Sequence, residues 1–403
     1  MSTRSRVCVW IAAVGLLLPS AARGQDRTER EVVELIVRDG RQARAIRAES
    51  EVIRREQLAR LAYPNPSVTY SREGAGFTEF FQAEQLLPIF RTRDALSRAG
   101  VAASAAADAE RDVRLWALRS EAAAAVARVV AGEMRMQSAR AHAGQVDRLI
   151  EILRIREKEG EGSRFDRLRA EQELREANQA ITSAAVALAE ARATLSGMLP
   201  PGVVVTSITG ARTAPTPAPA LDALVARSVT TRAELRVLQQ QRERAAFEAT
   251  AARRARLPAP SLFGGVKRAD ELSGRETGGV FGVTLSVPLF DTGSREAARW
   301  EAEGARADVE RAAIEHRVRG EIAGASEVLA LRQAALAQEQ QGAADDLAQI
   351  AEVAYREGEV GILELLDAVR TASRARMRSL ELRLDARLAQ IALERAVGET
   401  LWP

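Results

Sequence analysis

Two stretches of the chain alternate apolar residues with small or polar ones, which is the period of a β-strand and not of a helix. In the clearer stretch, which leads into Pro288-Leu289-Phe290, every second residue is apolar. About ten residues of such a strand cross a bilayer when the strand is tilted. We therefore predict a membrane-facing strand whose apolar side chains are Phe281, Val283, Leu285 and Val287.

The alternating pattern and its flanking prolines occur twice. A first hairpin is predicted at about 63–90 and a second at about 257–290, and Pro88-Ile89-Phe90 matches Pro288-Leu289-Phe290. Prolines suit these boundaries because they donate no hydrogen bond to a neighbouring strand. A repeat of this length indicates a duplicated unit. We predict a first unit at 25–210 and a second at 211–403. The alternative interpretation of each hairpin is an edge hairpin on a soluble domain.

Most of the remaining chain has the pattern of long helices. Thr28-Glu29-Arg30-Glu31 is a capping-box sequence, and an alanine-rich segment without proline runs from Arg91 to Lys158. A second long helix is predicted from Ser294 to about Glu357, whereas 198–219 is predicted to be an extended connector. Apolar residues spaced by three and four predict packed, coiled-coil-like seams. Each unit is therefore predicted to pair one long helix with two shorter helices placed end to end.

Glycine-rich breaks end both long helices, at 159–163 and at 358–361. Glycine permits the left-handed conformation in which a helix can end and reverse. The breaks therefore predict helix turns at the end of the bundle opposite the hairpins.

The two hairpins supply four strands, which cannot close a barrel by themselves. Lipid permits no open sheet edge. Three copies would supply twelve strands, and small closed symmetries are usual for homo-oligomers. We therefore predict a homotrimer with a shared 12-stranded β-barrel. A secreted chain with spanning strands belongs in the lipid of an outer membrane.

The first 24 residues have the pattern of a secretory signal peptide. Arg4 and Arg6 precede an apolar segment that is too short to span a membrane, and Ala22-Arg23-Gly24 fits cleavage before Gln25. Cleavage would lower the number of basic residues from 58 to 55, which equals the 55 acidic residues. Because arginine and glutamate are interspersed, we expect no nucleic-acid partner.

Residues suited to catalysis are few. The only cysteine, Cys8, lies in the predicted leader, and the sequence holds no nucleophile elbow and no phosphate loop. His142 and His316 lie in different predicted helices without a partner at metal-ligand spacing, so each is expected to be a solvated helix residue. We expect no enzyme activity, no cofactor and no metal site.

Over the whole chain after the leader, the pattern resembles the TolC-like outer-membrane efflux family. The resemblance is carried by Tyr63-Pro-Asn-Pro-Ser-Val68, by Gln85–Phe90, by Ala251–Pro260, by Val283–Phe290 and by the two breaks. Phe80–Arg93 is similar to the CzcC-like heavy-metal branch. The resemblance implies a mostly α-helical trimer whose strands form an outer-membrane pore. Long antiparallel coiled-coil helices continue this pore as an α-barrel through the periplasm.

The resemblance also implies a function and partners. Such a channel is a passive export duct for small molecules or metal ions, in drug or heavy-metal resistance. It receives its cargo from an inner-membrane transporter of RND type through a periplasmic adaptor. One alternative is the exit duct of a type I protein-secretion system. A different class is a soluble periplasmic coiled-coil scaffold or adaptor, which would explain the helices but not the two hairpins.

By position, the resemblance implies a gate at the periplasmic aperture that comprises Asp166, Tyr355, Glu364 and Asp367. Glu364 and Asp367 are spaced to share one helix face, so three copies would gather carboxylates around an axis and favour cations. The alternative is ordinary solvated helix charge. The basic residue of the family's latch is replaced by Val360, which would move the latch to Arg164 or Arg356. Helix-tip residues that would contact the adaptor are Gly160, Gly162, Ser163, Gly358 and Gly361.

Overall fold

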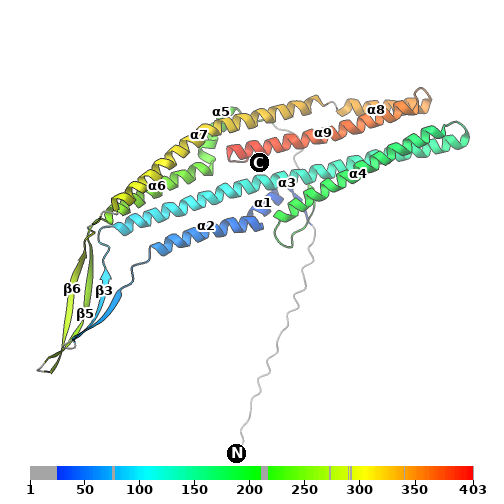
Figure 1. Cartoon of the computed structure of the whole chain (residues 1–403). Helices are drawn as coiled ribbons and strands as arrows, with labels where there is room; N and C mark the ends of the chain where they lie inside the picture. Colours follow the sequence, from blue (N-terminus) through cyan, green and yellow to red (C-terminus); the bar gives the residue numbers. More distant parts are fainter. Residues whose placement is uncertain are drawn as a thin grey trace, which may run out of the picture.

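The computed structural model describes residues 25–74, 78–209, 217–271, 274–288, 290, 293–339 and 341–402. The predicted signal peptide at 1–24 lies outside the described residues. The chain forms an elongated bundle of helices with strands at one end and helix turns at the opposite end (Figure 1).

The first half of the chain forms strands β1, β2, β3 and β4 and helices α1 to α4. Their bounds are β1 Gln25–Thr28, α1 Glu29–Asp39, α2 Arg41–Arg60, β2 Ser67–Glu73, β3 Thr78–Leu86, α3 Thr92–Glu159, α4 Arg164–Met198 and β4 Val205–Thr209. The second half continues with α5 Leu221–Thr231, α6 Ala233–Arg254, β5 Ala259–Glu271, β6 Gly274–Ser286, α7 Gly293–Gln338, α8 Gln341–Glu357 and α9 Ile362–Val397. The assignment of 25–210 and 211–403 as two repeated units stays a prediction.

Helix α3 is the longest element, at 68 residues, and it packs along α2, α4, α6 and α9. Its buried face consists largely of alanines, among them Ala99, Ala103 and Ala106, which allow neighbouring backbones to approach closely. Helices α2 and α4 follow one another along α3, as predicted (Figure 1). In the second half α7 packs against α6 and α9. Helices placed end to end therefore cover the apolar stripe of α3 over most of its length.

The N-terminal cap of α1 is the predicted capping box. The Glu31 amide donates to Thr28 Oγ1 at 3.2 Å, and the Thr28 amide donates to Glu31 Oε2 at 2.8 Å. Each bond satisfies a backbone donor that the first helical turn leaves without a partner. Gly40 then separates α1 from α2. A Cβ at this position would lie 2.3 Å from the Ile36 carbonyl oxygen, so the backbone here requires glycine.

The prediction of one continuous helix from Ser294 to Glu357 is wrong. Helix α7 ends at Gln338 and α8 begins at Gln341. The sequence at 337–344 carries no large apolar residue that could pack on a neighbouring helix, and it includes Gly342. Helices in proteins depend on packing for most of their stability, so a polar stretch with a glycine is a physical reason for the break.

The prediction of 198–219 as an extended connector did not include the small sheet that the structure shows. Strand β4 pairs in parallel with β1, and Arg27 lies opposite Ile208. The β-branched sequence Val203-Val204-Val205-Thr206 was a strand signal in the sequence. The pairing fastens the start of the described chain to the segment that follows α4. No helix in the described part of the chain is both long enough and apolar enough to cross a membrane.

Candidate functional site

Strands β2, β3, β5 and β6 form one antiparallel sheet in that order, so β2 and β6 are its two edges. Phe81 pairs with Tyr70 and Val266, and Leu262 pairs with Val283. Residues directly opposite one another share a face of a sheet. The exposed large apolar residues of one face are Val68, Tyr70, Phe81, Leu262, Val266, Phe281, Val283 and Leu285.

The apolar face contains three of the four residues predicted from the sequence, and Phe281 is its most exposed member at 88 %. Val287 follows the last strand residue and is also exposed. The sequence analysis did not predict Val68, Phe81 and Leu262, although each lies in an alternating stretch. Exposed apolar area on this scale marks a surface that another apolar phase or protein covers.

The opposite face of the sheet is more polar, although it also holds Phe80, Leu86 and Phe263. It carries Thr69, Gln82, Lys267 and Thr284, and the Lys267 ammonium lies 5.3 Å from the centre of the Phe80 ring. The Phe263 ring lies over Gly282 on this face. A Cβ at Gly282 would lie 2.6 Å from the ring, so the close approach requires glycine. One face of the sheet therefore carries most of the exposed large apolar residues and the other is more polar, which is the alternation of a membrane strand.

The two helix turns at the far end have the same backbone geometry. Gly160 and Gly358 adopt the left-handed conformation, with φ of 78° and 82°. The Glu161 amide donates to the Arg156 carbonyl, and the Glu359 amide donates to the Ala354 carbonyl, both at 2.9 Å. These bonds are those of a Schellman cap, in which glycine avoids the steric cost of positive φ.

The residues after each turn begin the next helix differently. Ser163 Oγ accepts a hydrogen bond from the Phe165 amide at 3.1 Å and caps α4, whereas Gly361 precedes α9 without a side-chain cap. Gly162 lies close to Arg156, where a Cβ would lie 3.0 Å from the Arg156 Cβ. All five predicted tip residues therefore lie in or beside the two turns.

Of the predicted gate residues, Tyr355 is buried and 8 % exposed. It packs in a cluster of apolar residues, here called the tip cluster, that joins the helices on either side of the two turns. The other buried members are Val146, Leu149, Ile150 and Leu153 from α3, Ala170 from α4, and Ile362, Leu365 and Leu366 from α9. Glu364 and Asp367 are exposed on the other side of α9. Asp166 is half-buried in the first turn of α4. Within the described residues, no hydrogen bond or ion pair joins it to Tyr355, Glu364 or Asp367.

The cation beside Tyr355 is Arg156, whose guanidinium carbon lies 5.1 Å from the ring centre. The predicted transfer of the latch to Arg164 or Arg356 stays a prediction. Arg356 pairs with Glu352 one turn earlier in the same helix, at 2.6 Å, and Arg164 is exposed at the start of α4. Arg156 is on α3, which the sequence could not align with Tyr355.

The expectation that His142 is solvated is wrong, whereas His316 is exposed as expected. His142 is 7 % exposed, and its Nε2 lies 3.7 Å from Glu173 Oε1. The spacing Ala139, His142, Val146, Leu149 follows the apolar stripe of α3, and it was a signal of burial in the sequence. Burial lowers the pKa of His142, and Glu173 opposes this effect.

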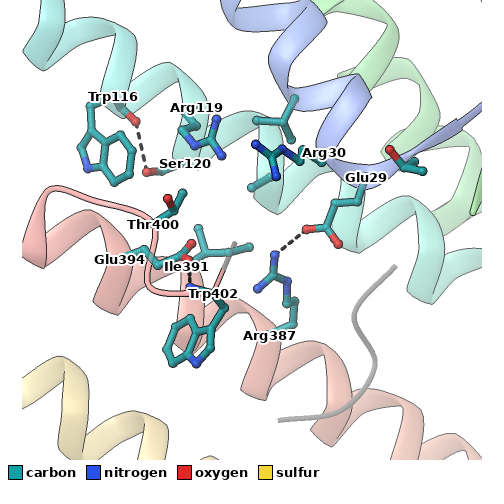
Figure 2. A pocket seen from close by; sticks show the side chains of 13 residues that line it. Glu29, Arg30, Trp116, Arg119, Ser120, Arg387, Ile391, Glu394, Thr400 and Trp402 are labelled. Atoms are coloured by element: carbon teal, nitrogen blue, oxygen red, sulfur yellow. Dashed lines mark hydrogen bonds and ion pairs between the residues drawn. The ribbon is translucent and has the colours of Figure 1, made fainter. Parts of the chain in front are cut away.

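A cavity of about 240 Å³ lies at the middle of the bundle, between α1, α3, α9 and the C-terminal residues (Figure 2). In it Arg387 of α9 donates to Glu29 of α1 at 2.5 Å. The Glu394 carboxylate accepts hydrogen bonds from the amides of Leu401 and Trp402. None of the sequence-predicted site residues lines this cavity, which joins the first and second halves of the chain.

The comparisons with known proteins agree with this architecture. Residues 224–399 match the outer membrane efflux protein family. None of the curated proteins matches the sequence. The fold is that of CusC, with a TM-score of 0.72, 17% identity and coverage of 95% of this chain and 95% of that chain. It is also that of the open state of the MtrE outer membrane channel of Neisseria gonorrhoeae, with a TM-score of 0.75, 20% identity and coverage of 93% and 90%.

The outer membrane protein VceC of Vibrio cholerae has a TM-score of 0.69 and 16% identity, with coverage of 93% of this chain and 97% of that chain. At these identities the solved structures show a common fold over nearly the full length. The second half of the chain is therefore similar in sequence to the outer membrane efflux protein family, and the fold over nearly the whole length is shared with CusC and MtrE.

Proposed function

We propose that this chain is the outer-membrane channel of a tripartite efflux system, a passive export duct that extends into the periplasm. The observation that carries the proposal is the four-stranded sheet at one end of the helical bundle, with one exposed apolar face and one more polar face. Lipid would cover the apolar face around Phe281 and Val283, and the polar face would line the pore.

The working form is a homotrimer. Strands β2 and β6 each have one neighbour in the sheet, so each leaves a row of backbone groups without a partner. Within lipid these groups have no water to bond, and every one left bare costs several kcal/mol. Pairing β6 of one protomer with β2 of the next satisfies the groups at both edges. Three copies then close a barrel of twelve strands, with no open edge.

The partners are a periplasmic adaptor and an inner-membrane transporter of RND type. The two helix turns lie at the end of the molecule farthest from the sheet (Figure 1). A channel anchored by its sheet in the outer membrane therefore presents these turns toward the inner membrane. The adaptor would contact the turns at Gly160, Gly162, Ser163, Gly358 and Gly361. The gate would be formed nearby, by Asp166, Tyr355, Glu364 and Asp367.

The sheet also separates the proposal from its main alternative. In a soluble periplasmic scaffold, the exposed apolar face that contains Phe281 and Leu285 would be in contact with water. Exposed apolar surface of this kind promotes aggregation, so the face argues against a soluble scaffold. The exit duct of a secretion system has the same architecture and differs in cargo. Survival of a deletion strain on metals and on drugs, compared with its secretion of proteins, distinguishes these two roles.

The first experiment is fractionation with site-specific labelling. The described chain contains no cysteine, so Val283→Cys and Thr284→Cys each introduce a single labelling position. We expect release from membranes by detergent but not by salt, a trimeric particle in detergent, and discrete conductance steps in planar bilayers. In lipid, a water-soluble maleimide should label Thr284→Cys and not Val283→Cys. A monomeric detergent particle with Val283→Cys readily labelled would overturn the proposal.

A further inference from the structure

Arginines gather where the strands of the four-stranded sheet continue into helices. The ten residues that join each strand to its helix, 57–66, 87–96, 249–258 and 287–296, together contain seven arginines and three acidic residues. The other end of the sheet is different, because 71–79 and 267–277 together contain four basic and five acidic residues. The helical end of the sheet therefore has a clear excess of positive charge.

Four of the seven arginines bond to oxygen atoms of the protein itself. Arg93 Nη2 donates to the Leu61 carbonyl at 2.6 Å, and Arg254 Nη1 donates to the Arg91 carbonyl at 2.7 Å. The other two of these four form ion pairs with glutamates on neighbouring helices. The four contacts hold the ends of α2, α3, α6 and α7 together beside the sheet (Figure 1). Their role is therefore structural.

The remaining three arginines, Arg91, Arg256 and Arg295, are exposed, and we call them the basic collar. They come from the ends of three helices that lie side by side. A Cβ at Gly293 would lie 2.6 Å from the Arg256 Cγ, so Arg256 lies beside the start of α7, close to Arg295 in sequence. The hydrogen bond from Arg254 places Arg91 beside the same end of α6. Three like charges are thus gathered in one region.

Helix capping does not explain the collar. Arg91 is the N-cap of α3 and Arg295 lies in the first turn of α7, where the helix dipole favours acidic residues and disfavours cations. Among the described residues, neither side chain has a hydrogen bond or an ion pair. Arg91 also has a φ of 54°, a left-handed conformation that glycine adopts at lower cost. An arginine at a strained position of this kind indicates a use for its side chain outside the helix.

The basic collar lies next to the apolar face of the sheet. Val287 continues that face toward α7, Phe90 directly precedes Arg91, and Leu257 directly follows Arg256; all three apolar side chains are exposed. The headgroup region of a bilayer adds roughly 5–7 Å to each side of the hydrocarbon core. Lipid that covers the apolar face would therefore place its headgroups at the collar. Arginine suits this level, because its apolar stem can lie against lipid while the guanidinium reaches the headgroups.

We propose that the basic collar binds the phosphates of anionic phospholipids, such as phosphatidylglycerol, in the leaflet on the periplasmic side of the membrane. The proposal rests on the proposed channel function, which places the sheet in the outer membrane. A guanidinium can donate two parallel hydrogen bonds to a phosphate, and a negatively charged leaflet attracts basic residues at its surface. In the trimer the collar is repeated around the barrel, so bound phosphates neutralise its like charges and fix the depth of the barrel in the bilayer.

The test is lipid retention by the full chain after reconstitution in vesicles of equal parts phosphatidylglycerol and phosphatidylcholine. The protein is extracted in an uncharged detergent at low salt, and the phospholipids that stay bound are counted by mass spectrometry. We expect bound phosphatidylglycerol to exceed bound phosphatidylcholine at least about tenfold. The triple variant Arg91→Gln, Arg256→Gln and Arg295→Gln should retain the two lipids in nearly equal amounts.

The matched control removes three charges elsewhere. Arg140→Gln, Arg169→Gln and Arg175→Gln change exposed arginines of α3 and α4 on the side of the helix turns, and this variant should keep the full preference. Added potassium chloride should weaken the preference of the unmodified protein, because salt screens exposed charges. Equal retention of both lipids by the unmodified protein at low salt, or the same preference in the collar variant and the control, would overturn the proposal.

Two further arms keep the result decisive. Circular dichroism and particle size check folding, and Arg295→Gln alone, expected to lower the preference about twofold, decides the matter if the triple variant does not fold. Inorganic phosphate, compared with potassium chloride at the same ionic strength, should displace no additional phosphatidylglycerol. Specific displacement by inorganic phosphate would assign the collar to a free anion and refute the lipid site.

A second measurement places the collar relative to the bilayer. A fluorophore on Ala298→Cys, exposed on α7 just after Arg295, should be quenched by phosphatidylcholine with a nitroxide on its headgroup, whereas Ala180→Cys on α4 should not. An unquenched Ala298→Cys would contradict the proposal. Neither measurement needs conduction. A trimer that conducts ions without a lipid preference refutes the collar alone, and a protein that salt releases from membranes refutes the proposed function.

Discussion

The guanidinium carbon of Arg156 lies 5.1 Å from the centre of the Tyr355 ring, and this contact joins the end of α3 to the end of α8. The ring is buried in the tip cluster, between apolar residues of α3 and α9. The contacts of Tyr355 are therefore made by its ring, which packs between the helices beside the two turns and lies next to a cation.

Replacing Tyr355 tests this role. We expect Tyr355→Phe to keep the stability and conductance of the unmodified protein, because it retains the ring. Tyr355→Ala should lower the free energy of unfolding by about 3 kcal/mol, the usual cost of removing a buried aromatic side chain. Arg156→Gln should cost about 1 kcal/mol. Denaturant unfolding in one detergent measures all three. A Tyr355→Phe variant as impaired as Tyr355→Ala would transfer the role to the hydroxyl group.

The local elements of this fold could be predicted from the sequence because their signals are local. The period of two around Val283, the capping box at Thr28 and the glycines at the two turns each depend on neighbouring residues, and the structure places elements there. The contact of Arg156 with Tyr355 depends on how α3 lies beside α8, which no short pattern encodes. The sequence could therefore predict that Tyr355 matters, but not its partner.

Two errors have a different origin. His142 follows the apolar stripe of α3, but its carboxylate partner is on another helix. The spacing of possible partners along the sequence therefore predicts a solvated histidine. The absence of proline predicts a continuous helix through Gln338, whereas the structure has a break after this residue. In both cases packing decided the outcome over residue type. The pairing of β1 with β4 likewise depends on packing between distant segments. Both strands are also too short to give a clear pattern in the sequence.

Neutralising the acids of α9 tests the gate. Glu364 and Asp367 are exposed on one side of the helix, and three copies would place their carboxylates around the tunnel axis. We expect Glu364→Gln with Asp367→Asn to change single-channel conductance and to weaken block by divalent cations, because the cation-attracting field at the aperture is lost. Recordings with and without added Mg²⁺ measure both effects.

The control for this experiment is an acid far from the aperture. Glu310 of α7 pairs with Arg306 at 2.8 Å on the helix surface, so Glu310→Gln removes a carboxylate without approaching the tip. We expect its conductance and block to match those of the unmodified protein. Equal behaviour of the double variant and the control would show that Glu364 and Asp367 are ordinary surface charges.

The two faces of the sheet predict opposite responses to a new charge. Val283→Arg places a guanidinium on the apolar face and should lower the stability of the inserted protein by about 2–4 kcal/mol near the membrane centre. Thr284→Arg adds the same group one residue later on the polar face. We expect it to leave insertion intact and to reduce cation conductance. Membrane yield and bilayer recordings compare the pair, and equal loss of insertion in both variants would contradict the assignment of the faces.

The carboxyl group of Glu394 predicts a pH dependence of stability at the middle of the bundle. It accepts hydrogen bonds from the amides of Leu401 at 3.0 Å and Trp402 at 3.3 Å, beside the Glu29–Arg387 ion pair (Figure 2). Burial raises its pKa above the ordinary value, although the two amides oppose the shift. The stabilisation that results is fully present below the unfolded pKa and is lost as the pH rises through the folded pKa.

We therefore expect the unfolding temperature of the unmodified protein to decline as the pH rises through the folded pKa of Glu394, and Glu394→Gln to remove part of this decline. The glutamine carbonyl can still accept from Leu401 and Trp402, so the variant separates the effect of the charge from that of the hydrogen bonds. Glu190→Gln, at an exposed position of α4, serves as the control and should keep the unmodified pH slope. If both variants share that slope, the pH dependence originates elsewhere, and the segment at 401–402 is held by its hydrogen bonds whatever the charge of Glu394.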